Sequence, residues 1–142
     1  MRPTAIAGFV LSFAMTGGVM AGFLLPQPAA ADERDISVGG VWVSKITHDA
    51  AGFSAQERAV EVTKRLTEIL SNPAYRHAGA MVAVRPVGQS AAILVGDQLA
   101  MTIMPEDTAG TGVTTMELAR QWAQRLAQGL GKALPDANFH TF

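Results

Sequence analysis

The side chains with acid–base or metal-binding potential are few and lie far apart in the chain. Three histidines are present, His48, His77 and His140, each in a predicted loop or in the C-terminal tail. A helical metal pair needs two such ligands four residues apart, and no two of them have that spacing. No serine stands in a G-x-S-x-G motif, the mark of one class of hydrolase nucleophile. The sequence therefore predicts no catalytic residue, no metal site and no cofactor.

One candidate ligand-binding cluster follows a predicted strand. Glu106, Asp107 and Thr108 together offer oxygen atoms of the kind that bind hard cations. The segment lacks the alternating oxygen ligands of a calcium loop, so we favour a solvated turn that leads into a helix.

A second candidate cluster is basic. Arg76, His77 and Arg85 would bind an anionic ligand if they shared one side of the domain, although scattered solvated charges are the simpler interpretation. Asp49 and Asp107 each follow a strand, and beside a cleft they would support hydrolytic chemistry. We predict that these two carboxylates and the histidines do not converge on a common pocket.

Composition excludes several classes of protein. The chain has 142 residues and a formal net charge of −1, which argues against a nucleic-acid binder because such proteins carry a surplus of Lys and Arg. It contains no cysteine, so a disulfide framework, a thiol nucleophile and a thiolate metal site are excluded.

Residues 1–31 have the order of a secretory signal. Arg2 gives a positive start, residues 5–25 are mostly apolar, and Ala29 and Ala31 form a small-residue cleavage site before a charged stretch. We predict export with cleavage after Ala31. An uncleaved anchor is the alternative, because the apolar run is long enough to span a bilayer.

The remaining chain alternates strand and helix patterns. Two capping boxes mark helix starts, one from Ser54 to Glu57 and one from Thr114 to Glu117, and apolar residues recur at helical spacing behind each. Short β-rich runs with glycine-rich turns predict four strands, at residues 40–46, 80–87, 91–95 and 99–104.

This β-α-β-β-β-α order predicts an α+β fold. We expect two layers, with a four-stranded, mainly antiparallel sheet and two helices on one of its faces. The expected organisation is an export segment or anchor (1–31), a lead-in (32–39), the α+β domain (40–134) and a tail (135–142).

Three segments give the domain a family resemblance. They are residues 53–59 at the first helix start, the Val95-Gly96-Asp97 turn, and residues 115–122 at the last helix start. Residues 40–134 resemble the N-terminal extracytoplasmic domain of cyanobacterial small-conductance mechanosensitive channel-like proteins, here as a free-standing exported domain. The chain departs from that pattern at residues 105–108, where an acidic, alanine-rich turn is expected. The resemblance implies an accessory or sensory module and supplies no catalytic residue.

These patterns lead to a functional expectation. We expect an exported, non-enzymatic binding, interaction or accessory sensory domain that acts through an exposed sheet face, an unpaired strand edge or the loop 105–113. Its expected partner is an envelope or membrane protein, in the periplasm, outside the cell, or in the thylakoid lumen if the source is a cyanobacterium. The alternatives are a small extracytoplasmic hydrolase or ligand-processing enzyme with unidentified catalytic residues, and a membrane-anchored accessory subunit if the N-terminal segment is retained.

Overall fold

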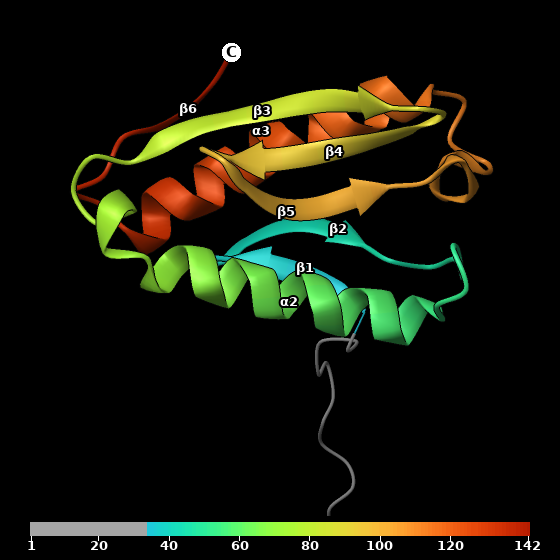
Figure 1. Cartoon of the computed structure of the whole chain (residues 1–142), viewed down its shortest axis with the longest axis horizontal. Helices are drawn as coiled ribbons and strands as arrows, with labels where there is room; N and C mark the ends of the chain where they lie inside the picture. The colour runs from blue at the N-terminus through green and yellow to red at the C-terminus, as the bar shows by residue number, and fades with distance from the viewer. Residues whose placement is uncertain (1–33) are drawn as a thin grey trace, which may run out of the picture. The chain divides into compact units, whose positions relative to one another are not determined.

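The computed structural model describes residues 34–142, which form two β-sheets and two α-helices (Figure 1). The export segment and its expected cleavage site at Ala29 and Ala31 lie outside these residues. Within them, neither helix has the length and apolarity needed to cross a membrane. In chain order the elements are β1 (Asp35–Val38), β2 (Val41–Lys45), α2 (Ala55–Ser71), η1 (Pro73–Tyr75), β3 (Ala80–Val87), β4 (Ser90–Val95), β5 (Gln98–Ile103), η2 (Pro105–Thr108), α3 (Thr115–Ala133) and β6 (Phe139–Thr141).

The larger sheet confirms the expected fold class. Its strand order is β5-β4-β3-β6, with β4 antiparallel to both β3 and β5, and β6 parallel to β3. The turn between β4 and β5 begins at Gly96, whose φ of 62° is readily available to glycine. Strand β6 pairs only with residues 80–82 of β3, so Pro86 lies where β3 has a free edge and needs no amide donor on that side.

Two strands were not expected from the sequence. Residues 35–38, expected within a lead-in, form β1, and residues 139–141, expected within a tail, form β6. The strand expected at residues 40–46 is present as β2, but it pairs with β1 in a separate two-stranded sheet, and β6 is the fourth strand of the larger one. Both unexpected strands are too short to show a clear two-residue period, which is why the sequence pattern misses them.

Both helices begin at the capping boxes that the sequence predicts. Ser54 Oγ accepts from the Glu57 amide at 3.1 Å, and the Glu57 carboxylate accepts from the Ser54 amide at 2.8 Å. Thr114 and Glu117 make the same reciprocal pair at the start of α3. Each box satisfies two backbone donors that a helix start would otherwise leave unpaired.

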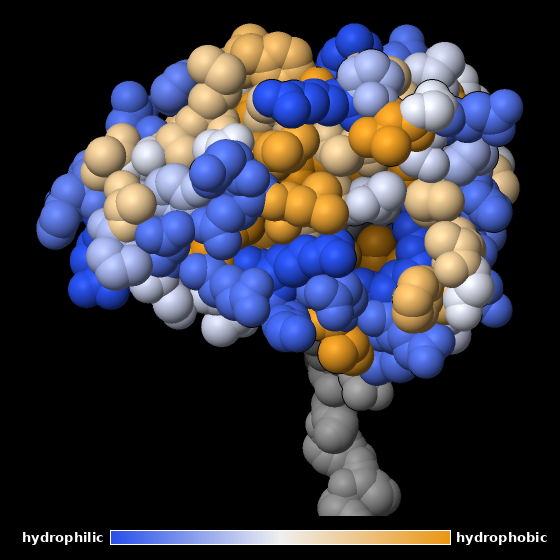
Figure 2. All heavy atoms as spheres, viewed as in Figure 1, coloured by the Kyte–Doolittle hydropathy of each residue, from blue (hydrophilic) through white to orange (hydrophobic). Residues whose placement is uncertain are grey.

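One hydrophobic core joins the helices to a single face of the larger sheet. On β3 the buried residues Val82 and Val84 alternate with exposed or half-buried ones, and they cluster with buried residues of β4 and β5 and with the buried stripes of α2 and α3. Neither of the helices within residues 34–142 covers the opposite sheet face, where Met81, Val87 and Leu99 are exposed. Figure 2 shows apolar side chains gathered on this uncovered face.

Strand β1 packs against α3 so closely that only glycine fits at one position. A Cβ added to Gly129 would lie 2.5 Å from the Val38 carbonyl oxygen, whereas one added to Gly131 meets nothing within 4 Å. In urea melts, Gly129→Ala is expected to lower the free energy of unfolding by about 1–3 kcal/mol. Gly131→Ala, the matched control on the same helix, is expected to raise it by up to about 1 kcal/mol through helix propensity. Equal stabilisation by both would show that β1 does not pack on α3.

The side chain of Tyr75 contacts the β4–β5 turn. Its ring is buried, and its hydroxyl lies 3.0 Å from the Val95 carbonyl oxygen and 3.3 Å from Asp97 Oδ1. The ring also meets Phe139 of β6 edge-on, with 6.4 Å between the ring centroids. Tyr75 therefore ties the hairpin turn to the last strand.

The environment of Tyr75 leads to an expected loss of stability at alkaline pH. Burial, followed by the negative charge of Asp97, raises the pKa of Tyr75 above its usual 10.0. As the pH rises, the tyrosine of the unfolded state therefore loses its proton before that of the folded state. The contribution of Tyr75 to the free energy of unfolding is complete below pH 10 and is lost as the pH rises through the folded-state pKa. Tyr75→Phe is expected to show a shallower decline in urea melts at alkaline pH. Because the chain has one tyrosine, tyrosinate absorbance reports this group alone. Parallel declines in both proteins would contradict the assignment.

Candidate functional site

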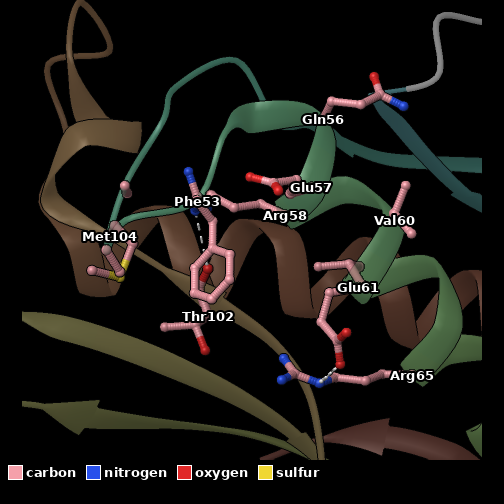
Figure 3. Close-up of a pocket in the computed structure, with 12 residues that line it drawn as sticks. Phe53, Gln56, Glu57, Arg58, Val60, Glu61, Arg65, Thr102 and Met104 are labelled. Atoms are coloured by element: carbon pink, nitrogen blue, oxygen red, sulfur yellow. Dashed lines mark hydrogen bonds and ion pairs between the residues drawn. The ribbon is translucent and has the colours of Figure 1, made fainter.

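A groove of about 570 Å³ lies between α2 and the edge strand β5 (Figure 3). Its lining is predominantly apolar, and it includes Phe53, Val60, Val62 and Met104. The charged side chains along it come mainly from α2. A groove of this size, with an apolar lining and a few polar groups, has the character of a ligand site.

The two most exposed large apolar side chains of the groove are Phe53 and Val60, each 58% exposed. Phe53 ends a tight turn, because its backbone and that of Ala50 exchange hydrogen bonds of 2.9 and 3.0 Å across Ala51 and Gly52. Both of these central residues have positive φ, 54° and 84°. Val60 follows the buried Ala59 on α2, so one residue of helical rotation turns it out of the core. The backbone thus holds both side chains at the surface.

The other side of the groove is an open strand edge. Among the strands of residues 34–142, β5 pairs with β4 alone, and its Thr102 carbonyl receives a long contact of 3.5 Å from Arg58 Nη2. That contact shows that the Thr102 carbonyl points away from β4. In an antiparallel ladder the amide and carbonyl of one residue point the same way, so the Thr102 amide also faces the groove side. Thr102 therefore presents a backbone donor and acceptor beside the apolar lining.

A buried ion pair closes one end of the groove. Arg58 donates from Nη1 to Asp107 Oδ1 at 2.9 Å and from Nη2 to Asp107 Oδ2 at 2.7 Å, and the two side chains are 10% and 3% exposed. Arg58 Nη1 also donates to the His48 carbonyl at 2.6 Å, and the Met104 amide donates to Asp107 Oδ2 at 2.8 Å. This bidentate pair ties α2 to the loop after β2 and to η2. Its carboxylate is fully engaged, so its role is to hold these segments together.

The acidic candidate cluster does not assemble into a cation site. Asp107 is buried against Arg58, where the sequence favoured a solvated turn. Glu106 is exposed, and the Thr108 hydroxyl donates to the Pro105 carbonyl at 2.7 Å. Among residues 34–142, no group of three or more His, Cys, Asp or Glu side chains is arranged to hold a metal ion.

The basic candidates are dispersed in the same way. Arg76 and His77 are exposed just after η1, whereas Arg85 is exposed five residues beyond the first residue of β3, about 16 Å along the strand. They form no common site.

The two aspartates and the histidines are also divided. His48 and Asp107 line a second cavity, but Asp49 lies outside it and accepts from the Ala55 amide at 2.8 Å at the start of α2. His140 is exposed on β6. The carboxylates of Asp49 and Asp107 are thus engaged in different structural contacts.

Sequence reasoning missed the residues that form the groove. Val60 carried a usable signal, because it is an apolar residue outside the buried stripe of α2. At Phe53 the sequence indicates only the start of a helix. Arg58 carried no signal, because its partner Asp107 lies 49 residues away and the pairing depends on the fold.

A comparison with known protein families gives a match that covers most of the chain. Residues 35–133 match a family described as a domain of unknown function, DUF8459. The chain belongs to this family. The DUF8459 match begins at the first residue of β1 and ends at the last residue of α3, so β1 is part of the family domain, whereas β6 follows it. No match was found among curated proteins or solved structures.

Proposed function

We propose that the protein is an exported, non-enzymatic binding domain that holds an extended, apolar-rich segment of a partner protein in the groove between α2 and β5. One observation carries this proposal. Phe53 and Val60 are held exposed beside an apolar groove that runs along an open strand edge. Export rests on the order of residues 1–31 and the cleavage site at Ala29 and Ala31.

The form of the groove favours an extended peptide as its occupant. A peptide beside an edge strand gains main-chain hydrogen bonds, and its alternate side chains enter adjacent pockets. The outward backbone groups of Thr102 supply the first feature, and the space between Phe53, Val60 and Met104 supplies the second. The edge offers these bonds at a site where water is partly excluded, which makes them worth more than at an open surface.

The electrostatics of the groove favour binding over catalysis. Arg58 is paired with Asp107, and Arg65 Nε lies 3.1 Å from Glu61 Oε2. Glu57 accepts from the Ser54 amide in the capping box. The polar atoms of these side chains already make contacts within the domain. The charged groups therefore orient the bound segment and keep the surface soluble, and the apolar residues of the groove provide the binding.

The partner we propose is an envelope or membrane protein. This part of the proposal rests on the predicted export and on the resemblance of residues 40–134 to an extracytoplasmic channel domain. In such a role the domain acts as an accessory or sensory module, because its occupied and empty states report the presence of the partner segment.

A peptide-library selection tests this function. The domain is expected to enrich peptides with alternating apolar residues, and Val60→Asp is expected to weaken the enriched peptides by about tenfold or more, as for an interface hot spot. The matched control is Val87→Asp, because Val87 is 59% exposed but lies on β3 away from the groove. Titration calorimetry with both variants gives the comparison. Equal affinities for the two variants, or no enriched peptides, would contradict the proposal.

A further inference from the structure

A second cavity of about 360 Å³ lies on the other side of the Arg58–Asp107 pair from the groove. Arg58 lines the groove and Asp107 lines this cavity, so the ion pair forms part of the wall between them. The remaining walls come from β2 and the loop that follows it, from the loop after η2 and from α3. We propose that this cavity binds a small organic oxyanion, whose carboxylate or phosphate group meets Arg125 and whose ring lies against Trp42.

Arg125 is the anchor for the anion. Its guanidinium is half-buried, donates from Nη1 to the Val43 carbonyl at 3.2 Å and lies 5.2 Å from the centroid of the Trp42 ring. Among residues 34–142, no carboxylate lies within ion-pair distance of it. A guanidinium has five N–H donors, so most of its donors are available to a ligand. Its planar fork matches the geometry of a carboxylate or phosphate.

The single acidic residue of the lining does not oppose an anion. Both oxygens of Asp107 are engaged by Arg58, and one also accepts from the Met104 amide. Arg125 therefore presents a positive charge to the cavity, although the whole chain has a formal net charge of −1.

The body of the ligand is specified by Trp42. Its indole N–H donates to Asp35 Oδ1 at 3.1 Å, which fixes the ring, and the side chain remains 49% exposed. An exposed, pre-oriented aromatic ring favours a partner with an apolar or sugar-like face. Gln121 adds an amide at the rim. An oxyanion carried on a compact ring satisfies all of these groups.

Three matched probes test this site on the folded protein. Glucuronate and glucose 6-phosphate supply a carboxylate and a phosphate on similar rings, and glucose is the neutral control. Because the chain has two tryptophans and both line the cavity, the two indole N–H signals in NMR spectra report binding directly. Saturable shifts with either anion, weakened by added salt and absent with glucose, are expected. If only one of the two anions binds, that result identifies the charged group of the ligand as a carboxylate or as a phosphate.

The variants separate a specific site from general attraction. Arg125→Gln is expected to weaken the anion about tenfold or more, because it removes a charge-assisted hydrogen bond. Lys132→Gln removes a charge from the same helix outside the cavity and is expected to leave affinity unchanged. No saturable shift with either anion would overturn the proposal. Equal affinities for wild type and Arg125→Gln, in a variant shown to be folded by its thermal melt, would do the same.

Discussion

Asp107→Ala is expected to lower the free energy of unfolding by about 3–5 kcal/mol. The substitution leaves the Arg58 side chain, which is 10% exposed, without the carboxylate that accepts two of its hydrogen bonds. Removing one partner of a buried ion pair has this cost because the remaining charge stays desolvated. The Met104 amide loses its acceptor in the same variant. Urea denaturation with a linear extrapolation measures the change.

Two further variants show that burial is the reason. Glu61→Ala breaks the exposed pair with Arg65, whose side chains are 47% and 32% exposed, and should cost no more than about 0.5 kcal/mol. Adding Arg58→Met to Asp107→Ala is expected to recover much of the lost stability, because no buried charge then remains unpaired. If Asp107→Ala and Glu61→Ala were equally mild, the Arg58–Asp107 pair would not be a buried structural link.

Trp122→Ala is expected to destabilise the protein by about 3–5 kcal/mol. Trp122 is 6% exposed and lies on the apolar stripe of α3 with Leu118 and Leu126. Truncation of a buried aromatic side chain removes its transfer free energy and leaves a cavity in the core. Because the same stripe covers the sheet, the truncation removes contacts from the main hydrophobic core.

Trp42→Ala is the matched control for Trp122. Trp42 is 49% exposed and is expected to lose about 1 kcal/mol, chiefly from its contacts with Arg125 and Asp35. Denaturant melts of the two variants give the comparison. A loss under about 1 kcal/mol for Trp122→Ala would show that its ring does not support the core and would make it a candidate for ligand stacking.

Local features of the fold were predictable because they depend on residues close in sequence. The Ser54 and Thr114 boxes fix both helix starts, and Gly96 fixes the β4–β5 turn. Features that depend on contacts between residues far apart in the sequence were not predictable. Residues 35–38 form a strand because they pair with β2 and pack on Gly129, and residues 139–141 do so because β3 offers a parallel edge.

The candidate site was less predictable than the fold. Residue type alone makes Arg76, His77 and Arg85 candidates for one anion site, but the fold disperses them over the surface. The groove depends on Phe53 and Val60 being exposed and on β5 being an edge, and strand order is a property of the tertiary fold. Asp107 was identified as a candidate, yet its buried pairing with Arg58 gives it a structural role.

Site-specific photo-crosslinking in the native cell shows whether the groove holds a segment of a partner protein. A photoreactive amino acid is placed at Val60 in the groove and, in a second protein, at the equally exposed Val87 outside it. We expect an adduct from position 60 that mass spectrometry maps to one apolar-rich segment of an envelope or membrane protein, with no such adduct from position 87. Adducts of equal yield at both positions, or none at position 60, would contradict a peptide-binding groove between α2 and β5.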